Sequence, residues 1–205
     1  MNILKTLSKR KLLVIGGAIV TMLIVLISYS LLSMMKPELM TRSSHNVAQT
    51  NENKQVYGLP VRLQVPSIGI DAPINQVGLT SQGDLDVPAG PDSTGWYKSG
   101  PRPGEVGSAV IDGHFGWKDE IPAVFDNLHK LKKGDVVRVE DENGKTITFT
   151  VSGSHTYTPD ENAEAVFRSS DEKAHLNLIT CQGDWNQDQK SYAERLVVFT
   201  SKKQQ

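Results

Sequence analysis

A cysteine, a histidine and an arginine in this sequence have the types and positions needed for nucleophilic acyl transfer. Cys181 is the only cysteine among 205 residues, and it follows an alternating apolar pattern typical of a strand, from Leu176 to Thr180. The thiolate is the reactive form of cysteine, and a free thiol has a pKa of about 8.5. A nucleophilic Cys181 therefore needs a base or a positive charge nearby, and a donor for the oxyanion of the tetrahedral intermediate.

Among the histidines, His114 is the best-placed base, because a short apolar strand pattern ends at it and its ring can project from a rigid edge. Asp112 lies two residues earlier on the same face of the strand, where a carboxylate would stabilise the protonated imidazole. His175 lies six residues before Cys181 in an extended segment, about 20 Å away, and is excluded as a direct partner. His155 lies at the end of a hairpin arm, and distance does not exclude it as a partner of Cys181.

Arg195 follows Cys181 after a polar stretch and begins the apolar run RLVVF. A loop that leaves one strand and feeds its neighbour brings the end of the first strand close to the start of the second. The sequence therefore predicts that Cys181 and Arg195 face each other, where a guanidinium would favour the thiolate and donate to a developing oxyanion. A cysteine at a strand end, taken alone, is more often a packing residue.

The N-terminal region predicts a membrane anchor. Residues 12–35 carry no charge over 24 positions, and an apolar helix of about 20 residues spans a bilayer. A cleaved signal peptide has an apolar region of only about 7–15 residues. Basic residues precede the span, which predicts that residues 1–11 are cytoplasmic and that the rest of the chain lies outside.

The segment after the anchor is predicted to be a flexible stalk, with one domain after it. Residues 36–57 are polar, include His45 and lack sustained periodicity, so they hold too little apolar surface to offset the entropy of ordering. Residues 58–205 have the length of one ordinary domain. Their net charge is −6 against +5 for residues 1–57, and an acidic domain argues against binding nucleic acid or anionic lipid. A single thiol outside the cytoplasm is intermolecular, reactive, or a small buried hydrophobe.

Strand patterns dominate the predicted domain. Apolar alternation recurs in about seven or eight short runs, and Asn143-Gly144 marks a hairpin turn. Only residues 121–131 have helical spacing of apolar side chains, with His129 on the polar face. The pattern predicts an all-β fold with few helices, either a sandwich or a closed barrel. The sequence contains no metal-type Cys/His cluster, phosphate-binding Gly-rich loop or dinucleotide fingerprint, so no metal or cofactor is indicated.

Three motifs resemble those of the sortases, the membrane-anchored cysteine transpeptidases of Gram-positive surfaces. They are GSAVIDGHFGW, LNLITCQGDW and ERLVVFT, in that order along the chain. The resemblance covers about residues 60–201 and implies a closed eight-stranded β-barrel, which favours the barrel over the sandwich. The combination of PAVFDNL and LKKGD with TCQGDW and YAERLVVF resembles the class F branch most closely.

The resemblance also implies a role for each matching residue. Cys181 would attack the threonyl carbonyl of an LPXTG-like sorting signal on a surface protein and form a thioacyl-enzyme. His114 would protonate the departing glycine amine and later deprotonate an incoming amine, from a cell-wall precursor or a pilin lysine. Arg195 would bind the substrate backbone and the oxyanion, and Thr180 would help to hold the substrate. The implied location is the cell membrane, with the catalytic domain extracellular.

Two other classes of protein share parts of this pattern. L,D-transpeptidases are exported and use a single cysteine, but the sequence LITCQGD lacks that family's Ser-His-Gly-Cys motif and the arginine two residues later. A non-enzymatic extracellular β-barrel binding module, with a buried structural cysteine, stays open on the residues alone. The reactivity of Cys181 separates this module from an enzyme, because a packing cysteine resists alkylation in the folded protein.

Overall fold

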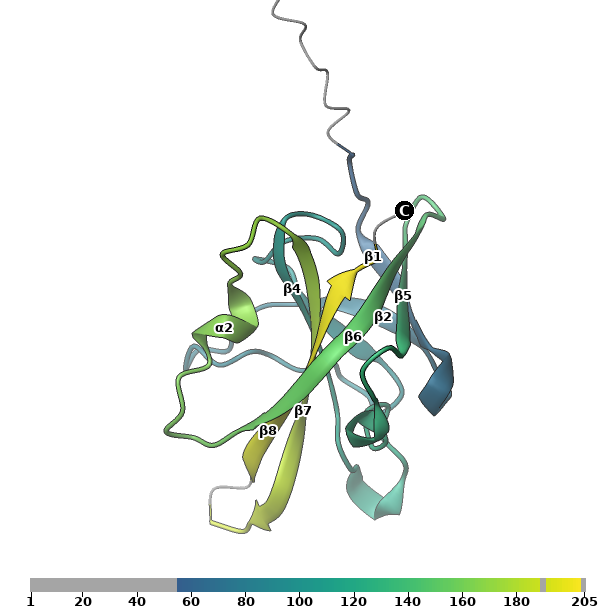
Figure 1. Ribbon diagram of the computed structural model, residues 1–205. Coiled ribbons are helices and arrows are strands. Elements are labelled where there is room, and N and C mark those ends of the chain that lie inside the picture. Colours follow the sequence, from purple (N-terminus) through teal and green to yellow (C-terminus); the bar gives the residue numbers. More distant parts are fainter. Residues whose placement is uncertain (1–54, 189–190, 204–205) are drawn as a thin grey trace, which may run out of the picture. The chain divides into compact units, whose positions relative to one another are not determined.

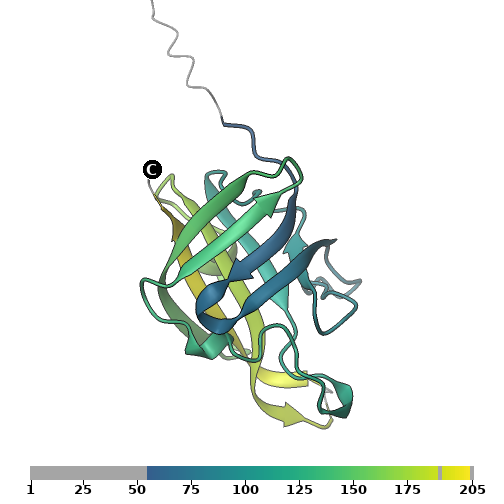
Figure 2. The same ribbon diagram turned by 90° about the vertical axis from the view of Figure 1, so that its right-hand side faces the viewer.

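Eight strands close into a barrel in the computed structural model, which describes residues 55–188 and 191–203 (Figures 1 and 2). The order around the barrel is β1-β2-β3-β4-β7-β8-β6-β5, so the predicted all-β fold and the closed barrel are confirmed. The strands are β1 (Pro60–Val65), β2 (Ile70–Val77), β3 (Thr94–Tyr97), β4 (Gly107–Gly113), β5 (Val136–Asp141), β6 (Thr146–Tyr157), β7 (Ala174–Asn186) and β8 (Ser191–Lys202).

Two pairs of consecutive strands run parallel, which explains two long connections: β2 and β3 pair directly, and β6 and β7 lie on either side of the antiparallel β8. Parallel strands cannot be joined by a tight turn, so the chain must travel back along the barrel between them. The β2–β3 connection spans residues 78–93, and the β6–β7 connection spans residues 158–173. The second carries the short helix α2 (Glu164–Phe167), which lies beside β4 on the outside of the barrel (Figure 1).

Strand β4 is buried on both of its faces. Ala109 and Ile111 point into the barrel and belong to the main core. Val110 points outward and is covered by Val166 of α2, in a second and smaller apolar cluster. Because successive side chains of a strand alternate between faces, Asp112 shares the outer face with Val110. A carboxyl group is thereby placed on a covered surface of the barrel.

The predicted helix at residues 121–131 is wrong. This segment forms a series of turns that ends in the 3₁₀ helix η3 (Leu128–Lys130), with two other 3₁₀ helices, η1 (Pro66–Ile68) and η2 (Lys118–Glu120), elsewhere in the fold. The backbone N–H groups of Val124 and Phe125 donate to the carbonyls of Pro91 and His114 instead of to carbonyls four residues back. Phe125, Leu128 and Leu131 still reach the core, whereas Ile121 is exposed, and His129 is exposed, as the pattern indicated.

The sequence suggested that a strand ends at Cys181, but β7 does not end there. It continues to Asn186 and pairs with β8 in a hairpin that extends beyond the barrel (Figure 1). A register shift lies between Gln182 and Trp185, where Gly183 has a positive φ of 85°. Such a bulge twists the ladder without ending it, and glycine adopts that backbone conformation at little cost. Cys181 therefore lies just before a bulge, inside a continuous strand.

The N-terminal parts of the prediction fall mostly outside the described residues. The predicted cytoplasmic segment, the anchor and the stalk up to residue 54 are not among them. Within the ranges that the structure covers, no helix has the length and apolar character to cross a membrane. Tyr57, assigned to the stalk, is 5 % exposed and belongs to the core, with the ammonium of Lys145 4.5 Å from its ring centroid. The folded region thus begins before residue 58.

Candidate active site

Cys181 and Arg195 are direct partners across the β7–β8 ladder. The next strand in the same row is β6, where Tyr157 pairs with Arg195. One row further along, Ile179 of β7 pairs with Val197 of β8. Strand alternation places all five side chains on the outer face of the barrel. The predicted juxtaposition of Cys181 and Arg195 is confirmed, although it arises within a ladder and not across a loop.

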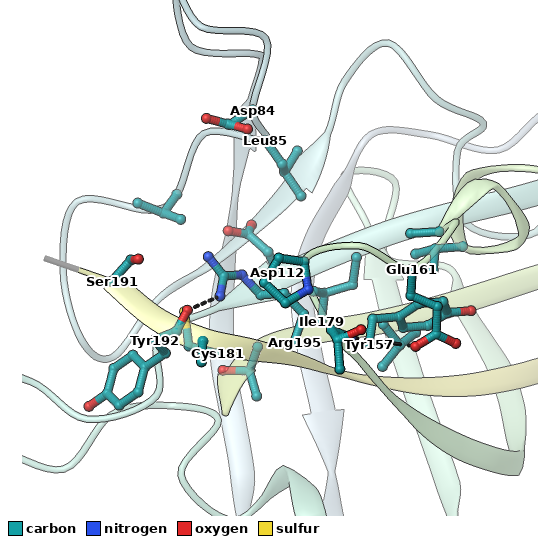
Figure 3. A pocket seen from close by; sticks show the side chains of 18 of the residues that line it. Asp84, Leu85, Asp112, Tyr157, Glu161, Ile179, Cys181, Ser191, Tyr192 and Arg195 are labelled. Carbon is teal, nitrogen blue, oxygen red and sulfur yellow. Dashed lines mark hydrogen bonds between the residues drawn. The ribbon is translucent and has the colours of Figure 1, made fainter. Parts of the chain in front are cut away.

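A pocket lies on this outer face, and Cys181 is one of the residues that line it (Figure 3). The β2–β3 connection supplies one wall through Leu85 and Val87, and α2 supplies another through Val166 and Phe167. The floor comes from the barrel strands β4, β6, β7 and β8. Its floor residues include Asp112, Gly113, Tyr157, Ile179, Thr180, Cys181, Arg195 and Val197.

Thr180 fastens the strand of the cysteine to the strand of the histidine. Its side chain is 4 % exposed, and Oγ1 donates a hydrogen bond of 2.7 Å to the carbonyl oxygen of Gly113. The β4–β7 register ends with Asp112 opposite Ile179. Continuing this parallel register by two residues brings the backbone of His114 beside that of Cys181. The two elements predicted to carry the base and the nucleophile are therefore neighbours.

The imidazole of His114 is held by the β2–β3 connection. Its Nε2 lies 2.7 Å from the carbonyl oxygen of Pro88, so Nε2 carries the proton and donates. Its ring centroid lies 4.7 Å from that of Trp117, in an edge-to-face contact. None of the hydrogen bonds among the described residues joins His114 to Cys181 or to Asp112, so the expected Asp112–imidazole contact is not seen. The backbone position matches the prediction, and the direction of the ring was not predictable.

Cys181 is a free, half-buried thiol. Burial raises its pKa, the guanidinium of Arg195 opposes that rise, and the carboxyl of Asp112 adds to it. Arg195 is exposed, and its Nη1 donates to the carbonyl oxygens of Tyr192 (2.9 Å) and Glu194 (3.0 Å). Carbonyl partners leave the guanidinium charge unneutralised beside the thiol. The positive charge favours the thiolate and the pocket's apolar walls oppose it.

The other candidate histidines have partners elsewhere. His155, left open by distance, places Nε2 2.5 Å from the Glu161 carboxylate and packs its ring against Tyr157. His175 places Nε2 2.8 Å from the carboxylate of Asp171. None of the three histidines, His114 included, is among the residues that line the pocket of Cys181, so the backbone position beside β7 is what distinguishes His114. Within the part of the chain that the structure describes, no group of three or more His, Cys, Asp or Glu side chains is arranged to hold a metal ion.

Sequence reasoning missed an aromatic cluster beside the site. Tyr192 packs edge-to-face against Phe115 at 5.4 Å and against Trp185 at 5.2 Å between ring centroids. Trp117 and Trp185 line a second, shallower pocket with Tyr192, which also lines the pocket of Cys181. The sequence offered only the presence of aromatic residues in the segments around His114 and Cys181. That Trp185 lies opposite Tyr192 follows from the hairpin register, which the sequence does not give.

Thr180→Val is expected to destabilise the protein by about 1–3 kcal/mol, because it removes the hydroxyl that satisfies the buried Gly113 carbonyl. Thr180→Ser, which keeps the hydroxyl, is the matched control and should lose less. Urea unfolding of the two variants measures the difference. Equal stability of the valine variant and the wild type would show that the Thr180–Gly113 bond does not hold β4 against β7.

A β-barrel in which a free cysteine and an arginine are paired on the floor of a surface pocket has the parts needed for cysteine acyl transfer. The model of the sortase domain matches residues 63–203, and the chain belongs to the sortase family. Its activity is accordingly that of a cysteine transpeptidase, and the alternative of a non-enzymatic module is set aside. The comparison with curated proteins found no match.

Solved sortases have the same fold. Sortase C-1 from Actinomyces oris is 27 % identical, with a TM-score of 0.56 over 71 % of this chain and 76 % of that chain. A lid mutant of sortase A from Corynebacterium diphtheriae is 21 % identical, with a TM-score of 0.56 over 77 % and 76 % of the two chains. Sortase C2 of pilus island 1 of Group B Streptococcus is 23 % identical, with a TM-score of 0.55 over 74 % and 77 %. Neighbours of more than one class thus share the barrel.

Proposed function

We propose that this sortase cleaves an LPXTG-like sorting signal at the Thr-Gly bond and transfers the threonyl acyl group to an amine at the cell surface. The observation that carries the proposal is the pairing of the free thiol of Cys181 with Arg195 on the floor of the pocket. The pocket provides apolar walls for the signal's side chains, and the ladder provides a fixed distance between the nucleophile and the cation.

In the first step, the Cys181 thiolate attacks the threonyl carbonyl carbon, and the carbonyl π electrons move to the oxygen. Arg195 donates to this oxyanion, as a charge-assisted hydrogen bond that strengthens as negative charge develops. Collapse of the tetrahedral intermediate breaks the Thr-Gly C–N bond and leaves a thioester on Cys181. An incoming amine then attacks the thioester carbonyl and releases the thiolate.

His114 serves as the acid and later as the base in this scheme. Its backbone lies beside that of Cys181, so rotation of the side chain moves the ring from the Pro88 carbonyl to the pocket. The protonated imidazole donates a proton to the departing glycine amine and then accepts one from the incoming amine. Thr180 helps to hold the substrate indirectly. Its hydroxyl donates to the carbonyl of Gly113 and so fixes the end of β4, which His114 follows.

The proposal includes the membrane layout that the sequence predicts. Residues 1–11 lie in the cytoplasm, 12–35 span the membrane, a stalk follows, and the domain, which begins before residue 58, faces outward. Cell-surface proteins with a C-terminal LPXTG-like signal are the proposed substrates. Some structural neighbours are described as pilus-related sortases, and a pilin lysine or a cell-wall precursor is the proposed acceptor. The class F branch is the proposed subtype, on the residues of its motifs.

A direct test uses the full-length chain with an LPXTG-like peptide and two acceptors, a glycine peptide and a lysine peptide. Ligated product, resolved by mass spectrometry, is the expected result, and the faster acceptor identifies the class of amine. Failure to cleave any peptide from a library of LPXTG-like signals would overturn the proposed substrate. Cleavage with no ligation to either amine would limit the activity to hydrolysis.

Arg195→Lys is expected to slow acylation by about 10²–10³-fold, the typical cost of losing one oxyanion donor. The planar guanidinium can donate two parallel hydrogen bonds, whereas the lysine ammonium is a compact point charge. Single-turnover acylation rates of the wild type, Arg195→Lys and Arg195→Ala measure the effect, with thermal melts to verify folding. If the lysine variant stays within a few-fold of the wild type, Arg195 only tunes the charge of Cys181.

A further inference from the structure

Asp112 is a buried carboxyl group in the pocket, with no established role. Its side chain is 4 % exposed and lines the pocket of Cys181. Among the described residues, neither Oδ1 nor Oδ2 has a hydrogen-bond partner other than the residue's own backbone N–H, although buried polar atoms in proteins nearly always have one. Both oxygens are covered, so their hydrogen-bonding capacity is unmet, and a group in the pocket reaches them after a rotation of the carboxyl toward the pocket.

The fold makes space for this carboxyl group. Gly95 of β3 pairs directly with Asp112 of β4. A Cβ added at Gly95 would lie only 2.3 Å from Oδ1 of Asp112 and 2.8 Å from Val77, so any other residue there would displace the carboxyl. The glycine therefore forms a cradle that seats the side chain on the pocket floor. Gly95→Ala is expected to disturb the same subsite.

Asp112 lies beside the residue of β7 that precedes the nucleophile by two positions. It is opposite Ile179, which precedes Cys181 by two residues on the same face of β7. Two residues of strand correspond to about 7 Å. A peptide that runs extended along β7, with its scissile carbonyl at Cys181, therefore brings the residue two positions before the scissile threonine near Asp112. In an LPXTG-like signal that residue is proline.

The charges around Asp112 favour its neutral form. Burial and the negative charge of Asp86 raise its pKa to about 8. Asp84 and Glu161 line the same pocket and add negative charge near the mouth. The cation on this face is Arg195, and its Nη1 is engaged with main-chain carbonyls.

The remaining titratable groups are Cys181 of β7 and Tyr157 of β6, which line the pocket and are labelled in Figure 3, and His114, which follows β4 and does not line the pocket. Tyr157 has a pKa raised by burial and by Glu161, so it stays neutral where Asp112 titrates. Because none of these groups supplies a cation directed at Asp112, the carboxyl carries an O–H at neutral pH. Such a group is a hydrogen-bond donor.

We propose that the protonated carboxyl of Asp112 donates a hydrogen bond to a backbone carbonyl oxygen of the bound sorting signal, on the acyl side of the scissile bond. The inference rests on the proposed function, because it places an LPXTG-like peptide in the pocket. Proline has no backbone N–H, so this part of the signal offers acceptors and no donor at that residue. A neutral carboxyl matches those acceptors, and an ionised one would leave two charged oxygens unpaired. Asp112 is thus a specificity-determining residue that recognises the peptide backbone.

The test measures peptide binding without turnover, in the full-length chain with Cys181→Ala. This background also removes the titration of the thiol. A fluorescent Leu-Pro-Ala-Thr-Gly peptide is titrated from pH 6.5 to 9.5 against Cys181→Ala alone and combined with Asp112→Asn or Asp112→Ala. Asparagine keeps a donor N–H and does not titrate, so it is the matched control.

Loss of the donor above the pKa should raise the Kd of the Cys181→Ala protein about 30-fold between pH 6.5 and 9.5. The Asp112→Asn combination should keep the tight Kd at both ends, while Asp112→Ala should bind about 10-fold more weakly throughout. Effects of His114 on binding appear equally in all three proteins and cancel in the comparison.

Tighter binding at high pH would overturn the proposal, because it would mean that the ionised carboxylate receives a donor from the peptide. An equal Kd for all three proteins at every pH would also overturn it. These outcomes are distinct from failure of the proposed function, which is measured by cleavage of the same peptide by the wild type. If the wild type cleaves the peptide but the Kd does not depend on residue 112, the proposed role of Asp112 is rejected and the proposed function stands.

Discussion

Cys181→Ala is expected to abolish cleavage and transfer of an LPXTG-like peptide, with a loss of about 10⁴-fold or more in rate, as for nucleophiles in other covalent enzymes. The fold should survive, because the side chain is half-buried at a strand position on the outer face and its truncation costs about 1 kcal/mol. Turnover and thermal melting of the variant and the wild type measure the two effects. Turnover of the variant at the wild-type rate would remove Cys181 from the mechanism.

The pH dependence of the thiol provides an independent check on the same residue. Because burial raises the pKa of Cys181 and the thiolate is the form that reacts, alkylation by iodoacetamide should accelerate as pH rises, up to a pKa above that of a free thiol. Asp112→Asn should shift this profile to lower pH, since the Asp112 carboxylate raises the pKa of Cys181. A profile unaffected by Asp112→Asn would show that the two groups do not interact.

His114→Gln is expected to leave the enzyme nearly inactive, with a loss of about 10²–10⁴-fold, the usual contribution of a general acid or base. Its backbone is beside Cys181, and glutamine keeps a side chain that can reach the Pro88 carbonyl. The matched control is His155→Gln, because the His155 ring is bound to the carboxylate of Glu161.

One LPXTG-like peptide and the same assay compare the two histidine variants. The expected order is near-normal activity for His155→Gln and almost none for His114→Gln. The reverse order would assign the proton transfers to His155. Similar losses in both variants would indicate a shared effect on folding, which thermal melts would reveal.

Many elements of the barrel can be predicted from local sequence patterns. The hairpin around Asn143-Gly144 forms as the turn chemistry predicts, and the apolar alternation of β7 and β8 places Cys181 opposite Arg195. Strand β3 escaped prediction because it is only four residues long and contains Gly95. The segment 121–131 has helical spacing, but long-range hydrogen bonds of its backbone to Pro91 and His114 direct it into turns.

The site was less accessible to prediction than the barrel. The sequence predicted that Cys181 faces Arg195 and that His114 follows a strand, whereas the neighbouring positions of His114 and Cys181 follow from the β4–β7 pairing. The direction of the His114 ring depends on the carbonyl of Pro88, which the β2–β3 connection brings from 26 residues away in sequence. The proposed role of Asp112 depends on Gly95 and on the cover supplied by the β2–β3 connection and α2. Such contacts are set by tertiary packing, which no local pattern encodes.

The central claim, that Cys181 carries the acyl group, is tested most directly by mass spectrometry of the full-length protein after brief incubation with an LPXTG-like peptide. The expected result is an added mass equal to the acyl part of the peptide up to and including its threonine, on the fragment that contains Cys181. This added mass should disappear when a glycine or lysine amine is added. An intact protein mass that never changes while the peptide is cleaved, or an adduct on any other residue, would contradict it.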